Sequence, residues 1–226
     1  QGKETRYRSR LLFMCSGYYR YSAGYTPEFP GLEEFAGTVV HPQLWPDDLD
    51  YSNKRVAVIG SGATAVTLIP AMAEKASHVT MVQRSPTYIV SMPGKDRLAN
   101  VLNALLPATW AYAITRWRKI RFQNYFYKQA IEKPAKTRAY ILKRLRKALK
   151  PEIDVEKHFT PSYDPWTQRL CLVPDSDFFH ALNSGKSDVI TGTISRITSE
   201  GIEMQDGVKV KADVLVTATG IQLELL

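Results

Sequence analysis

The segment from Arg55 to Val82 constrains the fold more than any other stretch of the chain. Residues 55–59 (RVAVI) have the composition of a buried strand, residues 60–62 (GSG) form a turn, and residues 63–75 have the pattern of a helix with few charges. Residues 78–82 (HVTMV) predict the next strand. Strand, turn, helix and strand in this order form a βαβ unit, which implies a parallel sheet with a right-handed crossover.

The turn of this unit has the pattern G-x-G-x-x-A. Gly60 allows a tight turn, Gly62 lets a pyrophosphate approach the backbone, and Ala65 lets the helix pack closely on the strand. The positive end of the helix dipole favours the negative charge of the phosphates. In this context the pattern predicts a dinucleotide site; the alternative is a small-residue turn in a generic α/β fold. The residues assigned to the cofactor are Gly60, Ser61, Gly62, Ala63, Thr64 and Ala65.

The end of the second strand indicates which dinucleotide is bound. The strand runs into Gln83-Arg84-Ser85, where sites for NAD or FAD usually place an acid that binds the ribose hydroxyls. A carboxylate would repel a 2′-phosphate, whereas a guanidinium can bind one with two parallel hydrogen bonds. We therefore expect NADP(H), with Arg84 reading the 2′-phosphate and Ser85 in support. The alternative is that Arg84 is an ordinary surface arginine.

The net charge of +8 is concentrated in one part of the chain. Between Ile114 and Lys150 the sequence has thirteen Lys or Arg residues and one acid, Glu132. Apolar residues at positions 141, 142, 145, 148 and 149 recur at helical spacing, so the charges are expected on the solvent face of helices. An anionic membrane or a nucleic acid is the less favoured explanation of this basic region.

The two cysteines, Cys15 and Cys171, lie far apart and have no metal-ligand spacing, so we expect no metal site. Buried free thiols in a reducing compartment are the favoured interpretation, so we expect the cytoplasm. The most apolar stretch, residues 99–115, is interrupted by Asn103 and Pro107 and is too short for a membrane span, so we expect a soluble protein. The chain begins at Gln1 without a methionine and stops at Leu226 soon after an apolar strand. We therefore expect a piece of a longer protein.

The rest of the chain has a weaker pattern. Residues 11–15 (LLFMC) predict a short strand that ends at Ser16-Gly17, and residues 18–53 predict a long ordered connection. Residues 86–160 predict a helical insertion, and residues 213–220 predict a buried strand with a small-residue turn. The aromatic residues of the insertion are expected to pack its helices together, with some lining a substrate channel: Trp110, Tyr112, Trp117, Tyr125, Tyr127 and Tyr140.

A second motif precedes the glycine turn. Phe35, Gly37, His41 and Trp45 form the pattern F-x-G-x-x-x-H-x-x-x-W, followed by Pro46-Asp47. This resembles the fingerprint of Baeyer–Villiger monooxygenases, which belong to the class B flavoprotein monooxygenases. The related N- and S-oxygenating flavin monooxygenases usually have Tyr or Phe where Trp45 stands. Three further segments are similar to the same class: residues 83–88, residues 213–220, and residues 159–177, which look closest to its ethionamide-activating branch.

The resemblance implies an α/β fold with two dinucleotide sites. Residues 54–212 would form a Rossmann-type NADP-binding domain with the helical insertion. Residues 1–53 would be the end of an FAD-domain segment and the interdomain linker, and residues 213–226 a return strand to the FAD domain. In this class NADPH reduces FAD, and a C4a-peroxyflavin then inserts oxygen from O2 into a ketone or oxidises sulfur. Two alternatives are a heteroatom-oxygenating flavin monooxygenase and a non-catalytic NADP-binding module.

The resemblance also implies roles for single residues. Arg169 would be the catalytic arginine that stabilises developing negative charge near the flavin. Gln168 stands where most relatives have a lysine that contacts phosphate. Phe35 and Trp45 would be packing anchors, and Gly37 would stand where the backbone requires a glycine. His41 would couple movement of the nicotinamide to the flavin, with a catalytic base as the alternative. We expect this piece alone neither to hold FAD tightly nor to turn over.

Overall fold

The computed structural model describes residues 4–15 and 17–224, so Ser16 and the two ends of the chain lie outside the described residues. The strand expected at residues 11–15 is wrong. These residues form no strand, and Leu11, Leu12 and Phe13 are each more than 70% exposed. The strand β1 lies later, at Tyr19–Gly24, inside the stretch that was expected to be a connection. It pairs antiparallel with β12 (Ile221–Leu223), near the other end of the chain.

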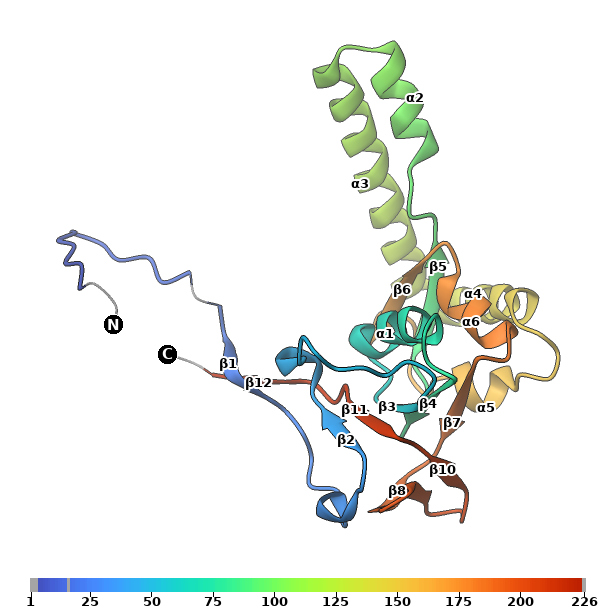
Figure 1. Cartoon of the computed structure of the whole chain (residues 1–226). Coiled ribbons are helices and arrows are strands. Elements are labelled where there is room, and N and C mark those ends of the chain that lie inside the picture. Colours follow the sequence, from blue (N-terminus) through green and yellow to red (C-terminus); the bar gives the residue numbers. More distant parts are fainter. Residues whose placement is uncertain (1–3, 16, 225–226) are drawn as a thin grey trace.

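A five-stranded parallel sheet forms the centre of the molecule (Figure 1). Its order is β2-β11-β3-β4-β7. The strands predicted at residues 55–59 and 78–82 are confirmed as β3 and β4, joined by the predicted helix α1. The bounds are β2 Thr38–Val40, β3 Arg55–Ile59, α1 Ala63–Ala73, β4 His78–Gln83, β7 Ser187–Thr191 and β11 Val214–Thr217.

The two faces of this sheet are covered in different ways. Val56, Val58 and Val79 pack with α1 and with α6 (Asp177–Asn183) in one core cluster. Ala57 and Ile59 face the other way and pack against a three-stranded antiparallel sheet. Because both faces are covered, the strands are almost continuously apolar. The covering sheet is made of β8 (Ile194–Thr198), β9 (Gly201–Met204) and β10 (Lys209–Lys211).

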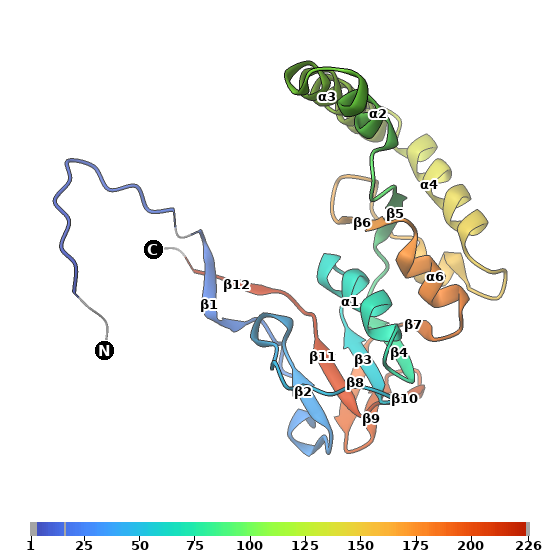
Figure 2. The same cartoon turned by 45° about the horizontal axis from the view of Figure 1, so that its top comes forward.

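A wholly helical insertion was expected between β4 and β7, but the insertion also contains strands. It begins with the strand β5 (Tyr88–Met92), which pairs in parallel with β6 (Leu170–Pro174) in a small second sheet. Between these strands lie the helices α2 (Arg97–Leu105), α3 (Ala108–Glu132), α4 (Pro134–Ala148) and α5 (Val155–Phe159). Helices α2 and α3 form a hairpin that projects from the body of the molecule (Figures 1 and 2).

Two expectations about the insertion have different outcomes. The helix inferred from residues 141–149 is confirmed as α4, whose Ile141, Leu142 and Leu145 are buried. The expectation that the aromatic residues of the insertion pack its helices is wrong for α3, because Trp110 and Trp117 are 67% and 64% exposed. Among the described elements only α2 lies beside the outer half of α3, so these elements leave most of the circumference of that half uncovered. No helix among the described residues is long and apolar enough to cross a membrane.

The strand expected at residue 213 as a return to the FAD domain forms β11, which lies in the five-stranded sheet. β11 lies between β2 and β3 and is parallel to both. β2, which lies in the expected linker, forms one edge of the same sheet. β1 and β12 lie outside the parallel sheet and pair with each other as a two-stranded unit (Figure 2). A boundary drawn at residue 213 therefore differs from the strand order, and the assignment of the flanking segments to an FAD domain stays a proposal.

Candidate functional site

The glycine turn lies where three strands of the parallel sheet end. Gly60 has φ +140°, and its amide donates a hydrogen bond of 2.9 Å to the carbonyl of Val82 on β4. A Cβ atom at Gly60 would lie 2.3 Å from the carbonyl oxygen of Ala218, just after β11. Both the backbone angle and the close approach therefore require glycine at this position.

The second glycine of the turn has a different environment. Gly62 is the N-cap of α1 at φ −81°, and no side chain caps the helix. A Cβ atom at Gly62 would have nothing within 4 Å, so the space in front of the helix is open. Ala65, in the first turn of the helix, is fully buried, while Ala63 and Thr64 are exposed. Because an open, uncapped helix N-terminus presents amide donors to anions, the site fits a dinucleotide pyrophosphate.

Ser61 joins this turn to two other segments. Its hydroxyl donates to the carbonyl of Ser85 at 3.4 Å, and its own carbonyl accepts from the thiol of Cys171 at 3.8 Å. Burial raises the pKa of the Cys171 thiol, so this group is neutral and packs as a small apolar side chain. Cys171 is a buried free thiol as expected, but Cys15 is exposed because its segment forms no strand.

The residue before Arg84 is held by a buried polar cluster. Gln83 is 1% exposed and donates to the carbonyl of His158 at 2.7 Å and to the hydroxyl of Thr191 at 2.8 Å. His158 also bonds Thr191, and burial lowers the pKa of the imidazole. The cluster therefore fixes the end of β4.

Arg84 itself is exposed. Within residues 4–15 and 17–224 its guanidinium has no hydrogen bond or ion pair. Ser85 is also exposed, and its carbonyl is bonded to the glycine turn through Ser61. A charged group with no internal partner, one residue beyond a fixed strand end, is available to bind a phosphate.

Arg169 stands just before β6, the strand whose Cys171 contacts the glycine turn. Its carbonyl accepts a 2.8 Å hydrogen bond from the hydroxyl of Tyr163, and the carbonyl of Tyr163 accepts one from Tyr88, also at 2.8 Å. The two tyrosine rings pack edge to face at 5.5 Å. The Arg169 and Gln168 side chains are exposed, so the backbone is anchored while both side chains remain free to contact a ligand. The role of Tyr163 as the anchor of this loop was not predicted from the sequence.

The fingerprint residues flank β2: Phe35 and Gly37 precede this strand, and His41 and Trp45 follow it. Phe35 is 9% exposed and packs in the core cluster beneath the antiparallel sheet. A Cβ atom at Gly37 would lie 2.3 Å from the carbonyl oxygen of Asp213 and 2.7 Å from the Phe35 ring. Phe35 therefore packs as an anchor, and Gly37 permits β2 to approach β11.

His41 follows β2 at its other end, near the glycine turn. Its Nδ1 accepts a 3.2 Å hydrogen bond from the amide of Gln43, so Nε2 carries the proton that is donated to the carbonyl of Gly220 at 3.0 Å. A Cβ atom at Gly24 would lie within 2.3 Å of the imidazole ring. His41 thus joins the segment after β11 to the end of β1. Trp45, four residues on, packs edge to face against Tyr51 at 6.3 Å.

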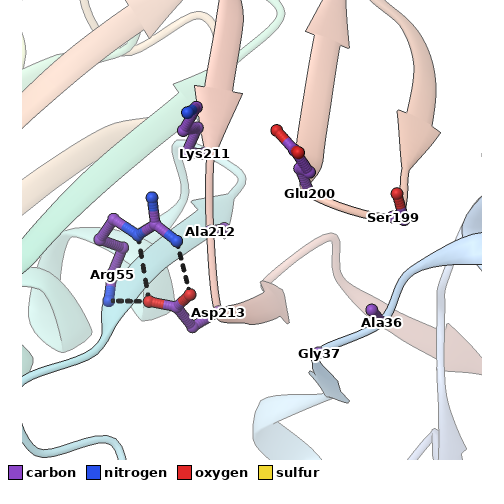
Figure 3. Close-up of a pocket in the computed structure, with 8 residues that line it drawn as sticks. All are labelled: Ala36, Gly37, Arg55, Ser199, Glu200, Lys211, Ala212 and Asp213. Carbon is purple, nitrogen blue, oxygen red and sulfur yellow. Dashed lines mark hydrogen bonds and ion pairs between the residues drawn. The ribbon is translucent and has the colours of Figure 1, made fainter.

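A cavity of about 490 Å³ lies at the opposite edge of the sheet, where the parallel strands begin (Figure 3). Arg55 and Asp213 face each other in it and form two side-chain hydrogen bonds, of 2.7 and 3.1 Å. The amide of Arg55 donates a third bond to Asp213, and these contacts lower the pKa of Asp213 to about 2. Ligands of parallel sheets bind beyond the carboxyl ends of the strands, so this cavity is not the cofactor site. The pair holds β3 against β11.

The structure brings several of the predicted residues together and leaves others apart. Ser61 of the glycine turn is hydrogen-bonded to Ser85 and to Cys171 at the start of β6. The segment Ala218–Gly220 approaches Gly60 at Ala218 and accepts a hydrogen bond from His41 at Gly220. Phe35 and Gly37 lie at the far end of the sheet. Ala218 was not assigned a role, although the small-residue sequence Ala-Thr-Gly after β11 was a signal for close packing.

The described residues contain no cluster of three or more potential metal ligands.

The parallel sheet and the open glycine turn are those of the dinucleotide-binding α/β class of proteins. Within this class, residues 1–161 match the family model of flavin-binding monooxygenase-like proteins. The chain belongs to the flavin-binding monooxygenase-like family.

Curated relatives agree with this assignment. The chain is 51% identical over 216 residues to the FAD-containing monooxygenase EthA of Mycobacterium tuberculosis, covering 95% of this chain and 44% of the relative. It is 46% identical over 225 residues to EthA of Mycolicibacterium smegmatis, covering 99% of this chain and 46% of the relative. The chain therefore spans less than half the length of these relatives.

Solved structures share the fold. An oxidized steroid monooxygenase bound to NADP superposes with a TM-score of 0.68 at 22% identity, over 92% of this chain and 46% of that one. A complex of OTEMO with FAD and NADP gives a TM-score of 0.67 at 21% identity, over 90% of this chain and 46% of that one. The expected α/β fold class is confirmed by this likeness and by the parallel sheet.

Proposed function

We propose that this chain is the NADP-binding part of an FAD- and NADPH-dependent monooxygenase that acts on ketones or on sulfur compounds. The observation that carries the proposal is the open helix N-terminus behind Gly60 and Gly62, with Arg84 one residue beyond the adjacent strand and without an ion pair among the described residues. The family and the FAD-containing relatives support the flavin part of the proposal. Two free cysteines agree with a reducing compartment, so we propose the cytoplasm as its location.

The residues of this chain would bind and orient the cofactor. The amides of the first turn of α1 would bind the pyrophosphate, and Arg84 with Ser85 would bind the 2′-phosphate. Gln168 is exposed beside Arg169 and would contribute a further polar contact. When bound, NADPH supplies reducing equivalents and FAD supplies the chemistry that activates O2.

Arg169 would stabilise negative charge in the reaction. Its guanidinium is permanently charged, its backbone is held by Tyr163, and its strand lies against the glycine turn through Cys171. A fixed cation aimed at developing negative charge in a site shielded from water stabilises a transition state strongly. The role requires that the longer protein, which we propose contains this chain, places the flavin near the start of β6.

The test is NADPH oxidation by this longer protein with a panel of ketones, sulfides and thioamides, with the products identified. We expect esters or lactones from ketones, or sulfoxides from sulfur compounds, and a loss of about 100-fold or more in kcat in Arg169→Ala. Arg97→Ala, which removes an exposed arginine on the α2–α3 hairpin, serves as the matched control. NADP binding without oxidation of any substrate would support a non-catalytic NADP-binding module instead.

We further propose that His41 couples the cofactor site to the rest of the enzyme. Both ring nitrogens are engaged, one with Gln43 and one with the carbonyl of Gly220, which follows the segment packed on Gly60. His41→Ala is expected to slow turnover about tenfold and to raise the ratio of NADPH consumed to product formed. Product yield and H2O2 are measured together. A pH profile of kcat that loses one titrating base in the variant would contradict this role and support a catalytic base.

A further inference from the structure

The hairpin of α2 and α3 carries an uncharged, exposed tip. Residues 98–115, here called the hairpin tip, contain no charged side chain. Large apolar side chains at the tip face solvent: Leu105 is 76% exposed, Trp110 67% and Tyr112 63%. Ala111 is the tip's one buried residue. The hairpin projects from the body of the molecule, so no other part of the described chain covers this surface (Figure 1).

Five cations flank the tip on the two arms of the hairpin. Arg97, Arg116, Arg118, Lys119 and Arg121, here called the basic belt, lie on the two arms of the hairpin, and residues 97–131 contain no acid. Asp96 accepts from the amide of Ala99 at 3.1 Å and pairs with Arg118 and, at 3.1 Å, with Lys119, so it ties the arms together at this level. The other three cations form no ion pair within residues 4–15 and 17–224.

The distance between belt and tip suits a lipid interface. The nine residues of α2 span about 14 Å along the helix axis. Amphipathic elements that lie in the membrane interface bury their apolar side chains about 5–10 Å deep. Trp and Tyr favour that level, and Lys and Arg favour the anionic headgroups above it. The guanidinium of Arg121 lies over the Trp117 ring, 5.5 Å from its centroid, so a cation and an aromatic ring occur together at the level of the basic belt.

We propose that the hairpin tip inserts into the interface of an anionic lipid bilayer, with the basic belt at the headgroups. The chain would bind the surface without spanning it, since no described helix is long and apolar enough to cross. A second copy of the chain fits less well, because pairing two tips would bring two basic belts together. A nucleic acid would use the belt but leave Leu105 and Trp110 without a role.

The test measures binding of the purified chain to sedimenting vesicles of neutral phosphatidylcholine, with and without about one third phosphatidylglycerol. We expect binding to the anionic vesicles and little to the neutral ones. Leu105→Ser with Trp110→Ser should weaken binding about tenfold or more. Arg116→Gln with Arg121→Gln should weaken it about 25-fold, at about fivefold for each cation removed. Circular dichroism and the Tm of each variant establish that it is folded.

The matched controls lie outside the hairpin. Leu223→Ser removes a 70% exposed leucine on β12, and Arg8→Gln removes an exposed arginine of the N-terminal segment. Both should bind like the parent chain. Equal binding to neutral and anionic vesicles, or tip variants that bind unchanged, would overturn the proposal. Self-association in the absence of lipid that is lost in the tip variants would assign the surface to a second copy instead.

Discussion

Replacing Arg84 with alanine is expected to weaken NADPH binding about 10- to 100-fold and to leave NADH binding almost unchanged. Charge-assisted hydrogen bonds to a phosphate contribute about 1.5–3 kcal/mol each, which corresponds to this range. The side chain is exposed, it has no partner within residues 4–15 and 17–224, and it follows a strand end that Gln83 fixes. The variant should therefore lose the contact with the 2′-phosphate and keep its fold.

Titration of the purified chain with NADPH and with NADH measures the effect directly. The ratio of the two dissociation constants is the decisive quantity, because a general loss of binding would change both. Arg97→Ala serves as the control, since it removes an exposed arginine on the α2–α3 hairpin. A ratio of NADPH to NADH affinity in Arg84→Ala equal to that of the parent chain would show that Arg84 is an ordinary surface arginine.

Changing each of the two glycines of the turn to alanine is expected to affect the stability of the protein differently. Gly60→Ala should reduce the free energy of unfolding by about 2–4 kcal/mol, from backbone strain at positive φ and from overpacking. Its new Cβ would lie 2.3 Å from the Ala218 carbonyl oxygen, a backbone atom that cannot rotate away. Gly62→Ala should leave stability nearly unchanged, because φ is −81° and a Cβ there meets nothing within 4 Å.

The same pair tests the cofactor site. Gly62→Ala should fold normally and lose NADPH affinity about tenfold or more, because its methyl group fills the space where the pyrophosphate approaches the backbone. Denaturant unfolding measures the first property and nucleotide titration the second. If a folded Gly62→Ala variant binds NADPH as tightly as the parent chain, the pyrophosphate does not bind at this helix N-terminus. A Gly60→Ala variant as stable as the parent would contradict the close approach of Ala218.

Features that depend on neighbouring residues were predicted well. The strands at residues 55–59 and 78–82, the helix between them and the helix inferred from residues 141–149 each have a local apolar pattern, and each is present. The glycine turn was also predicted, because its strand and helix flank it directly in the sequence. The position of Arg84 followed from the end of β4, because a strand end fixes where the next side chain can lie.

Features that depend on distant partners were not predicted. Residues 11–15 have a strand-like composition but no partner strand among the described residues, whereas the less apolar Tyr19–Gly24 pairs with Ile221–Leu223. β5 lies in the expected helical insertion and was not predicted, because its partner strand β6 comes four helices later in the chain. The anchoring of Arg169 by Tyr163 likewise depends on how one loop folds back on itself.

The sequence by itself determined the βαβ unit, its glycine turn and the cation that follows β4, because short-range periodicity and backbone requirements specify them. Only the tertiary structure decided that β11 lies between β2 and β3, that His41 bonds the segment packed on Gly60, and that Trp110 stands in solvent. The physical reason is that pairing, closure and exposure depend on which surfaces meet. A local pattern marks a side chain as apolar but does not specify what covers it.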